Sequence, residues 1–161
     1  MNSSEAPAEA LRVGGDLIEP QMTSVASGGA LFAYDVTFAP GGGPPHLHRH
    51  DAVELFKLEH GELTFYLADE HGELARRSAG PGEVVAVPAN REHTVRNESR
   101  APARALAVLS PGEEMERFAR LAAALGAAAN PERVAALAAE TGIEITRPLP
   151  PPVRPPLPSS G

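Results

Sequence analysis

The chain has 161 residues, with 14 lysines and arginines against 21 aspartates and glutamates, so its formal net charge is -7. This length suits a single domain, and the acidic balance argues against nucleic acid as a partner, because phosphate binding needs clustered lysine and arginine. The sequence contains no cysteine, which excludes disulfide bonds, zinc ribbons, iron–sulfur clusters and thiol nucleophiles. Any metal ion must therefore be held by histidine or carboxylate side chains.

The N-terminal segment, residues 1–10, is polar and lacks the basic and apolar stretches of a secretory signal. We expect it to be a flexible lead-in. The sequence nowhere reaches the roughly 18 consecutive apolar residues that a membrane helix needs. These features predict a cytoplasmic protein with no membrane partner, with one folded domain over residues 11–146.

Short strands are predicted along the first two thirds of the chain. Residues 31–38 alternate, with Phe32, Tyr34, Val36 and Phe38 on one face. Further short apolar or β-branched segments, each bounded by glycine, proline or asparagine turns, occupy residues 62–67, 84–87 and 106–109. Strands of this length with such turns are typical of an all-β sandwich or barrel.

The pattern becomes helical after Pro111, and we expect two short C-terminal helices at about residues 112–126 and 131–141. Asn130 followed by Pro131 is a favourable helix start, because asparagine caps the free amides and proline fits the first turn. Ile143 and Ile145 then alternate as in a short closing strand.

Residues 147–161 form a proline-rich tail. Proline removes amide donors and fixes φ, so we expect an extended polyproline II segment without a core of its own. It is either a solvated tail, an arm across a neighbouring subunit, or a ligand for an aromatic groove.

The histidines are unevenly distributed, and three of the six lie at alternate positions, His46, His48 and His50. In an extended chain these side chains share one face, and Glu54 has the same parity. Imidazoles with one carboxylate are the ligand set of a first-row divalent metal ion. The alternative is that the histidines belong to a polar loop.

A second segment contributes His93. Residues 82–88 read as a strand that ends in a tight turn at Pro88–Asn90, after which His93 and Val95 share a face of the next strand. An isolated histidine is usually structural, but this one accompanies the cluster described above.

Together the two segments form a pair of motifs. The first reads G-x5-H-x-H-x3-E-x6-G, at Gly42, His48, His50, Glu54 and Gly61. The second reads G-x5-P-x-N-x2-H-x3-N, at Gly82, Pro88, Asn90, His93 and Asn97. They resemble the two motifs of the cupin superfamily, and the trailing helical segments resemble those of single-domain, quercetin-dioxygenase-like bacterial cupins.

The resemblance implies a small double-stranded β-helix barrel, of jelly-roll type, with two short C-terminal helices. It further implies that His48, His50, Glu54 and His93 bind one divalent transition-metal ion (Fe, Mn, Ni, Co or Zn), with Glu54 as ligand or as catalytic base. Two departures stand out. Asn90 replaces the usual glycine of the second motif, and the spacing leaves His46 and His48 as the alternative histidine pair.

The implied function is an oxidoreductase of dioxygenase type acting on a small apolar or aromatic molecule. The alternatives are a non-redox isomerase or polyketide cyclase, and a non-catalytic small-molecule-binding module.

The outward-facing apolar side chains of Val53 and Leu55 predict a homodimer. His60 and His71 are expected to be solvated turn residues. Five aromatic residues are candidates either for the pocket wall or for plain core: Phe32, Tyr34, Phe38, Phe56 and Phe65.

Overall fold

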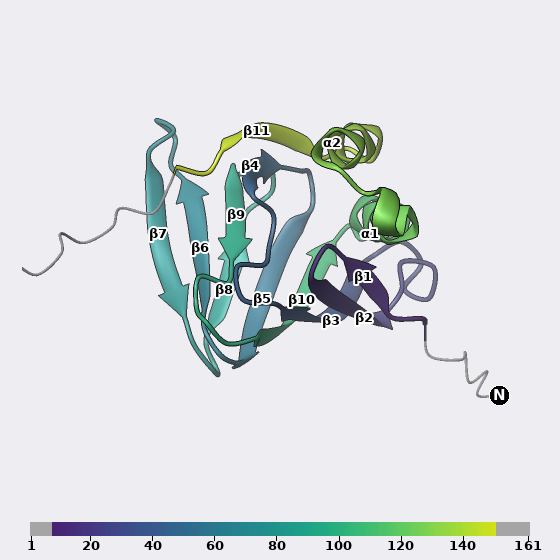
Figure 1. The fold of residues 1–161 in the computed structure, drawn as a ribbon, viewed down its shortest axis with the longest axis horizontal. Helices are drawn as coiled ribbons and strands as arrows, with labels where there is room; N and C mark the ends of the chain where they lie inside the picture. Colours follow the sequence, from purple (N-terminus) through teal and green to yellow (C-terminus); the bar gives the residue numbers. More distant parts are fainter. Residues whose placement is uncertain (1–7, 151–161) are drawn as a thin grey trace, which may run out of the picture.

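The computed structural model describes residues 8–150, so most of the expected lead-in and most of the proline-rich tail lie outside the described residues. The described residues form two β-sheets that face each other (Figure 1). The six-stranded sheet has the order β1-β2-β3-β10-β5-β8, with the bounds β1 Leu11–Val13, β2 Asp16–Met22, β3 Phe32–Phe38, β10 Ala103–Ser110, β5 Val53–His60 and β8 Val84–Val87. The five-stranded sheet has the order β11-β4-β9-β6-β7, with the bounds β11 Glu144–Pro148, β4 His46–Arg49, β9 His93–Arg96, β6 Leu63–Ala68 and β7 Leu74–Ala79.

The core lies between the two sheets and follows the alternation of the central strands. Every second residue of β3 and of β10 is buried, and the buried residues of β10 are mostly alanine. Ala107 on β10 pairs with Tyr34 on β3 and with Phe56 on β5. A small side chain therefore lies between two large rings in this row of residues across the sheet. The ring of Phe56 meets that of Phe65 from the opposite sheet at a centroid distance of 5.2 Å. The predicted all-β barrel is confirmed, and the five aromatic residues lie in its core.

Two helices follow the last core strand, as the sequence predicts. They are α1 (Glu113–Leu125) and α2 (Pro131–Glu140), joined through a 3-10 turn, and Figure 1 shows them beside the barrel, with α1 near β1. The Asn130 side chain caps α2 by accepting a hydrogen bond from the Arg133 amide at 2.9 Å. Within residues 8–150, neither helix is both long enough and apolar enough to cross a membrane.

Helix α1 is tied to the barrel by a buried carboxylate. Glu116 is 6% exposed and accepts a hydrogen bond from the Ser24 amide at 2.6 Å, while Arg120 donates to the other oxygen. At the start of the helix, Gly112 lies so close to β3 that a Cβ there would sit 2.2 Å from the Phe32 nitrogen. These contacts place the first turn of α1 over one end of the barrel.

Candidate metal centre

The first motif supplies two histidines from β4 and the residues just after it. His48 lies on β4 and is 8% exposed, while His50 follows the strand and is 5% exposed. The backbone of His50 is held by the second motif, because its carbonyl accepts a hydrogen bond from the Asn90 amide at 2.8 Å. Asn90 has φ of 58°, the left-handed conformation that glycine adopts most easily and that asparagine tolerates. The asparagine therefore preserves this turn.

The second motif brings His93 next to His48. His93 is the first residue of β9, which pairs with β4, and the two histidines are direct partners in that ladder. The approach of the two segments depends on Gly43, where a Cβ would lie 2.2 Å from the Val95 carbonyl oxygen. The two motifs, distant in sequence, thus become neighbouring strands.

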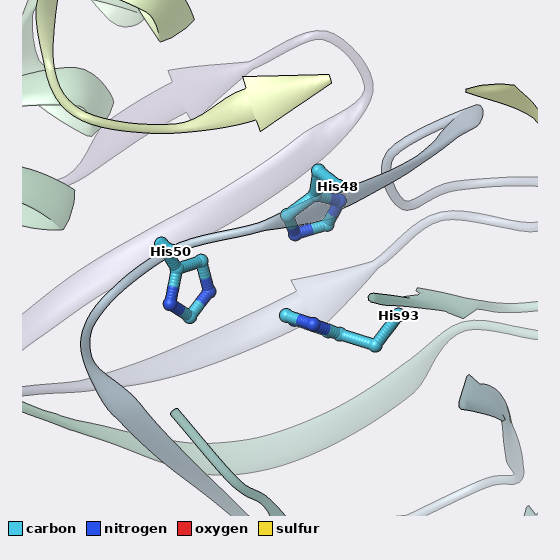
Figure 2. A group of neighbouring side chains, drawn as sticks. All are labelled: His48, His50 and His93. Carbon is cyan, nitrogen blue, oxygen red and sulfur yellow. The ribbon is translucent and has the colours of Figure 1, made fainter. Parts of the chain in front are cut away.

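The three histidine rings converge in the interior (Figure 2). The centroid of the His93 ring lies 4.5 Å from that of His48 and 5.0 Å from that of His50, and one ligand nitrogen from each ring falls within 4.8 Å of the others. Glu54 reaches them from β5 of the opposite sheet: its Oε2 is 3.1 Å from His93 Nε2 and 3.3 Å from His50 Nε2. His46 is not part of this group among the described residues.

Backbone contacts set the tautomer of each ring. The Nδ1 atoms of His48, His50 and His93 lie 3.2, 3.0 and 2.7 Å from the carbonyl oxygens of His46, Ala52 and Arg91. A carbonyl oxygen only accepts, so each Nδ1 carries the proton and a neutral ring keeps its lone pair on Nε2. Orienting ring nitrogens in this way is typical of metal-binding histidines.

The donor set fits a bound cation. His50 Nε2 is buried and lacks a hydrogen-bond partner among the described residues, although it faces the Glu54 carboxylate. A lone pair opposite a carboxylate oxygen is repulsive unless a proton or a metal ion lies between them. Three imidazole nitrogens and one carboxylate are ligands that first-row divalent metals accept.

Burial and the neighbouring side chains set the charges in the site. Burial, and then the neighbouring His93, lower the pKa of His48 to about 4, so this ring is neutral near pH 7. Burial alone raises the pKa of Glu54, but the adjacent imidazoles of His50 and His93 lower it well below its ordinary value. Burial lowers the pKa of His50, while the Glu54 carboxylate and then the hydrogen bond to the Ala52 carbonyl raise it, with a net increase. Glu54 is therefore ionised, as a metal ligand must be.

Glu114 is not part of either sequence motif. It belongs to the first turn of α1, is exposed, and lies with its carboxylate against Gly142. His60 and His71 are exposed, at the end of β5 and in the turn before β7.

Asn97, the last residue of the second motif, is fully buried. Its side chain donates hydrogen bonds to the backbone carbonyls of Phe38 and Ala101 and does not belong to the histidine cluster.

Two surface hollows lie away from the histidines. One, of about 570 Å³, separates α2 from β11 and is lined by Ala135, Ala139, Gly142, Ile143, Glu144 and Ile145. The other, of about 350 Å³, is polar and lies outside β4, lined by Arg49, Ala68, Asp69, Glu70, Gly72, Asn90, Arg91 and Glu92. Neither includes a residue of the three-histidine group.

Two facing sheets with a histidine cluster between them define a small double-stranded β-helix barrel with a candidate metal centre. Residues 34–109 match the family model of the cupin domain, a segment that runs from β3 through β10. This central part of the barrel is therefore similar to the cupin domain.

Comparisons with known proteins agree with this assignment. The chain is 32% identical over 78 residues to auxin-binding protein 1 of Arabidopsis thaliana, an alignment that spans 46% of this chain and 39% of that protein. An oxalate decarboxylase from Bacillus subtilis superposes with a TM-score of 0.57 at 17% identity, covering 70% of this chain and 31% of that one. A recombinant oxalate oxidase in complex with glycolate gives 0.55 at 20% identity, covering 86% and 79%. These two structural likenesses concern the fold alone.

Proposed function

We propose that the barrel binds one divalent transition-metal ion through the Nε2 atoms of His48, His50 and His93 and the carboxylate of Glu54. The observation that carries this proposal is the set of three Nδ1 contacts to backbone carbonyls, which leave the Nε2 lone pairs free within one buried cluster. Imidazole and carboxylate together accept Fe, Mn, Ni, Co or Zn, so the ion has to be identified by measurement.

We further propose that the protein is an oxidoreductase of dioxygenase type, similar to quercetin-dioxygenase-like bacterial cupins, that acts on a small apolar or aromatic molecule. A redox-active ion, when bound, supplies the electron transfer between substrate and O2. Glu54 is the group that accepts a proton from a substrate hydroxyl or enol, because its carboxylate is ionised and faces the interior. The aromatic core excludes water around these groups.

A second candidate is a small-molecule-binding module without catalysis. The similarity to auxin-binding protein 1 favours it, because that protein is named for binding and its aligned segment covers about half of this chain. The same four side chains would then hold a metal ion that orients the ligand. A non-redox isomerase or cyclase on the same scaffold would instead use the ion to polarise a carbonyl group.

Elemental analysis of protein purified without added metal tests the centre itself. We expect about one ion per chain in the wild type, loss of most of it in His50→Gln, and retention in His71→Gln, whose side chain is exposed. His46→Gln should retain the ion as well, because His46 lies outside the cluster. A metal-free wild type, or retention in His50→Gln with loss in His46→Gln, would show that the proposed ligand set is wrong.

The identity of the ion and the uptake of oxygen separate the candidate functions. Iron, manganese or nickel with O2 consumption on flavonol-like or 1,3-dicarbonyl substrates supports the dioxygenase. Zinc without O2 uptake supports a non-redox enzyme, and a loaded protein that binds but does not convert ligands supports the binding module.

A further inference from the structure

The shortest of the three contacts that orient the histidine rings is made to a residue outside the strands. His93 Nδ1 lies 2.7 Å from the Arg91 carbonyl oxygen, against 3.0 and 3.2 Å for the contacts of His50 and His48. Arg91 and Glu92 lie between β8 and β9 and belong to neither strand. A strand ladder therefore does not fix the direction of the Arg91 carbonyl, and other contacts have to hold it.

Two hydrogen bonds to Ala68 hold the peptide that carries this carbonyl. The Arg91 guanidinium donates to the Ala68 carbonyl at 3.1 Å, and the Ala68 amide donates to the Glu92 carbonyl at 2.9 Å. Ala68 is the last residue of β6, the strand that pairs with β9 and places Leu67 opposite His93. The peptide between Arg91 and Glu92 is thus tied on both sides to one fixed point of the sheet.

A third contact reaches the same peptide from the C-terminal strand. Arg147 on β11 donates to one carboxylate oxygen of Glu92, through Nε at 3.1 Å and Nη2 at 2.7 Å. The same Nη2 donates to the Gly72 carbonyl at 2.7 Å, and the Glu92 side chain is only 13% exposed. Strand β11 lies outside residues 34–109, which match the cupin domain. The segment after the helices therefore contributes to the surroundings of the candidate centre.

Arg91 is accessible to substitution because it lies at the surface and not in the core. Its side chain is partly exposed and lines the polar hollow of about 350 Å³ together with Ala68 and Glu92. Truncation of Arg91 leaves no sealed cavity between the two sheets, which is the change that destabilises a core most. We therefore expect Arg91→Ala to fold, so that its effect on the centre can be measured.

We propose that Arg91 is a positioning residue for the metal centre and that Arg147 supports it through Glu92. The Arg91 guanidinium fixes the carbonyl that keeps the proton on His93 Nδ1, which leaves the Nε2 lone pair free for the ion. This inference rests on the proposed metal centre and adds the residues that prepare one of its ligands.

The neighbouring carboxylate explains why the carbonyl matters. Glu54 Oε2 lies 3.1 Å from His93 Nε2 and only accepts hydrogen bonds when ionised. Once the Arg91 carbonyl turns away, the favoured tautomer carries its proton on Nε2 and donates it to Glu54. That tautomer has to lose the proton before Nε2 binds a metal ion, so metal binding becomes weaker.

The test measures Zn(II) affinity and the ring of His93 in the full-length protein. Competition with a chromophoric chelator gives the affinity, and proton–nitrogen correlation spectra of the zinc-loaded protein report the Nδ1 proton. Arg91→Ala should weaken Zn(II) binding by about 10- to 100-fold, the range for loss of a contact that orients a ligand. The Nδ1 proton of His93 should exchange faster with water than in the wild type, whereas those of His48 and His50 should not. Arg91→Lys keeps a donor for the Ala68 carbonyl and should restore most of the affinity.

Two further variants complete the test. Arg147→Ala releases only the Glu92 side chain, so it should weaken Zn(II) binding by less than Arg91→Ala. Arg77→Ala is the matched control, because the Arg77 guanidinium also donates to a backbone carbonyl, that of Val84 at 3.4 Å, but has no contact with the peptide that holds His93. It should change neither the affinity nor the His93 signal.

The inference is overturned if either Arg91→Ala or Arg147→Ala keeps the wild-type affinity, or if Arg91→Lys binds Zn(II) no better than Arg91→Ala. A weaker Arg91→Ala with an unchanged His93 signal would also overturn it, because the loss would then be a general effect on the fold. A wild type that takes up no Zn(II) would instead refute the proposed metal centre, so the two failures are distinguishable.

Discussion

Asn97 closes the second motif, and its replacement by alanine tests whether that motif residue is structural. The side chain is fully buried and acts both as a hydrogen-bond donor and as an acceptor. Its Nδ2 donates to the carbonyls of Phe38 at 3.1 Å and Ala101 at 2.8 Å, and its Oδ1 accepts from the amide and hydroxyl of Ser99 at 3.0 and 2.7 Å. The backbone of Asn97 also pairs with Gly41 and Gly42 at the start of the first motif.

At about 1 kcal/mol for each hydrogen bond, with a further penalty for the carbonyl of Phe38 left unpaired in the core, Asn97→Ala should lower the free energy of unfolding by roughly 3–5 kcal/mol. Urea titration followed by circular dichroism measures this loss. Ser99→Ala, which keeps both Nδ2 bonds, should lose only about 1 kcal/mol. The folded fraction of Asn97→Ala should still bind metal. A loss below about 1 kcal/mol, or a stable protein with an empty centre, would refute the structural role.

Three further predictions concern the turn, the protonation of the site and the outer face of the barrel. Asn90→Ala should lower the free energy of unfolding by about 1 kcal/mol in urea because of its positive φ, and Asn90→Gly should change it by less. The pKa of His48 falls from 6.5 in the unfolded chain to about 4, so metal-free protein should lose on the order of 3 kcal/mol of stability between pH 6.5 and 4. His48→Gln should flatten that decline in urea titrations, and an unchanged slope would count against it. Val84 is 47% exposed on β8, beside β5, and we propose that this face forms a homodimer interface. The wild type should then be a dimer in light scattering and Val84→Lys a monomer, whereas Val25→Lys, in an exposed loop, should remain a dimer.

The sequence was most informative where one face of a strand is buried and the other is not. Residues 31–38 alternate and residues 84–87 are a short apolar segment, and they form β3 and β8 with nearly the expected bounds. Strand β7 gave no such signal, because it lies at the edge of its sheet and its arginines, Arg76 and Arg77, are exposed. Strand β2 was also missed, since Pro20 interrupts its pattern next to a bulge.

The features of the candidate site also differ in how well the sequence predicts them. Parity placed His46, His48, His50 and Glu54 on one face, and the motif resemblance singled out His48, His50 and Glu54. Parity alone could not do so, because the chain leaves β4 after Arg49 and continues as β5 of the other sheet. The tautomers of the histidine rings could not be predicted from the sequence. They depend on backbone carbonyl groups whose direction is defined only in the folded chain. The contact of Glu114 with Gly142 depends on how α1 docks against the segment after α2, which is a tertiary contact.

The arrangement of the site also explains why two short motifs suffice to build it. His48 and His93 are partners within one sheet, whereas Glu54 comes from the other, so the four side chains meet only when the sheets pack face to face. In the folded barrel, the lone pairs of the rings and the Glu54 carboxylate face one another in a buried space, which is unfavourable without a cation. A metal ion that binds there relieves this repulsion and joins the two sheets. Metal binding and barrel packing are therefore linked, because an ion that binds only the folded state stabilises that state.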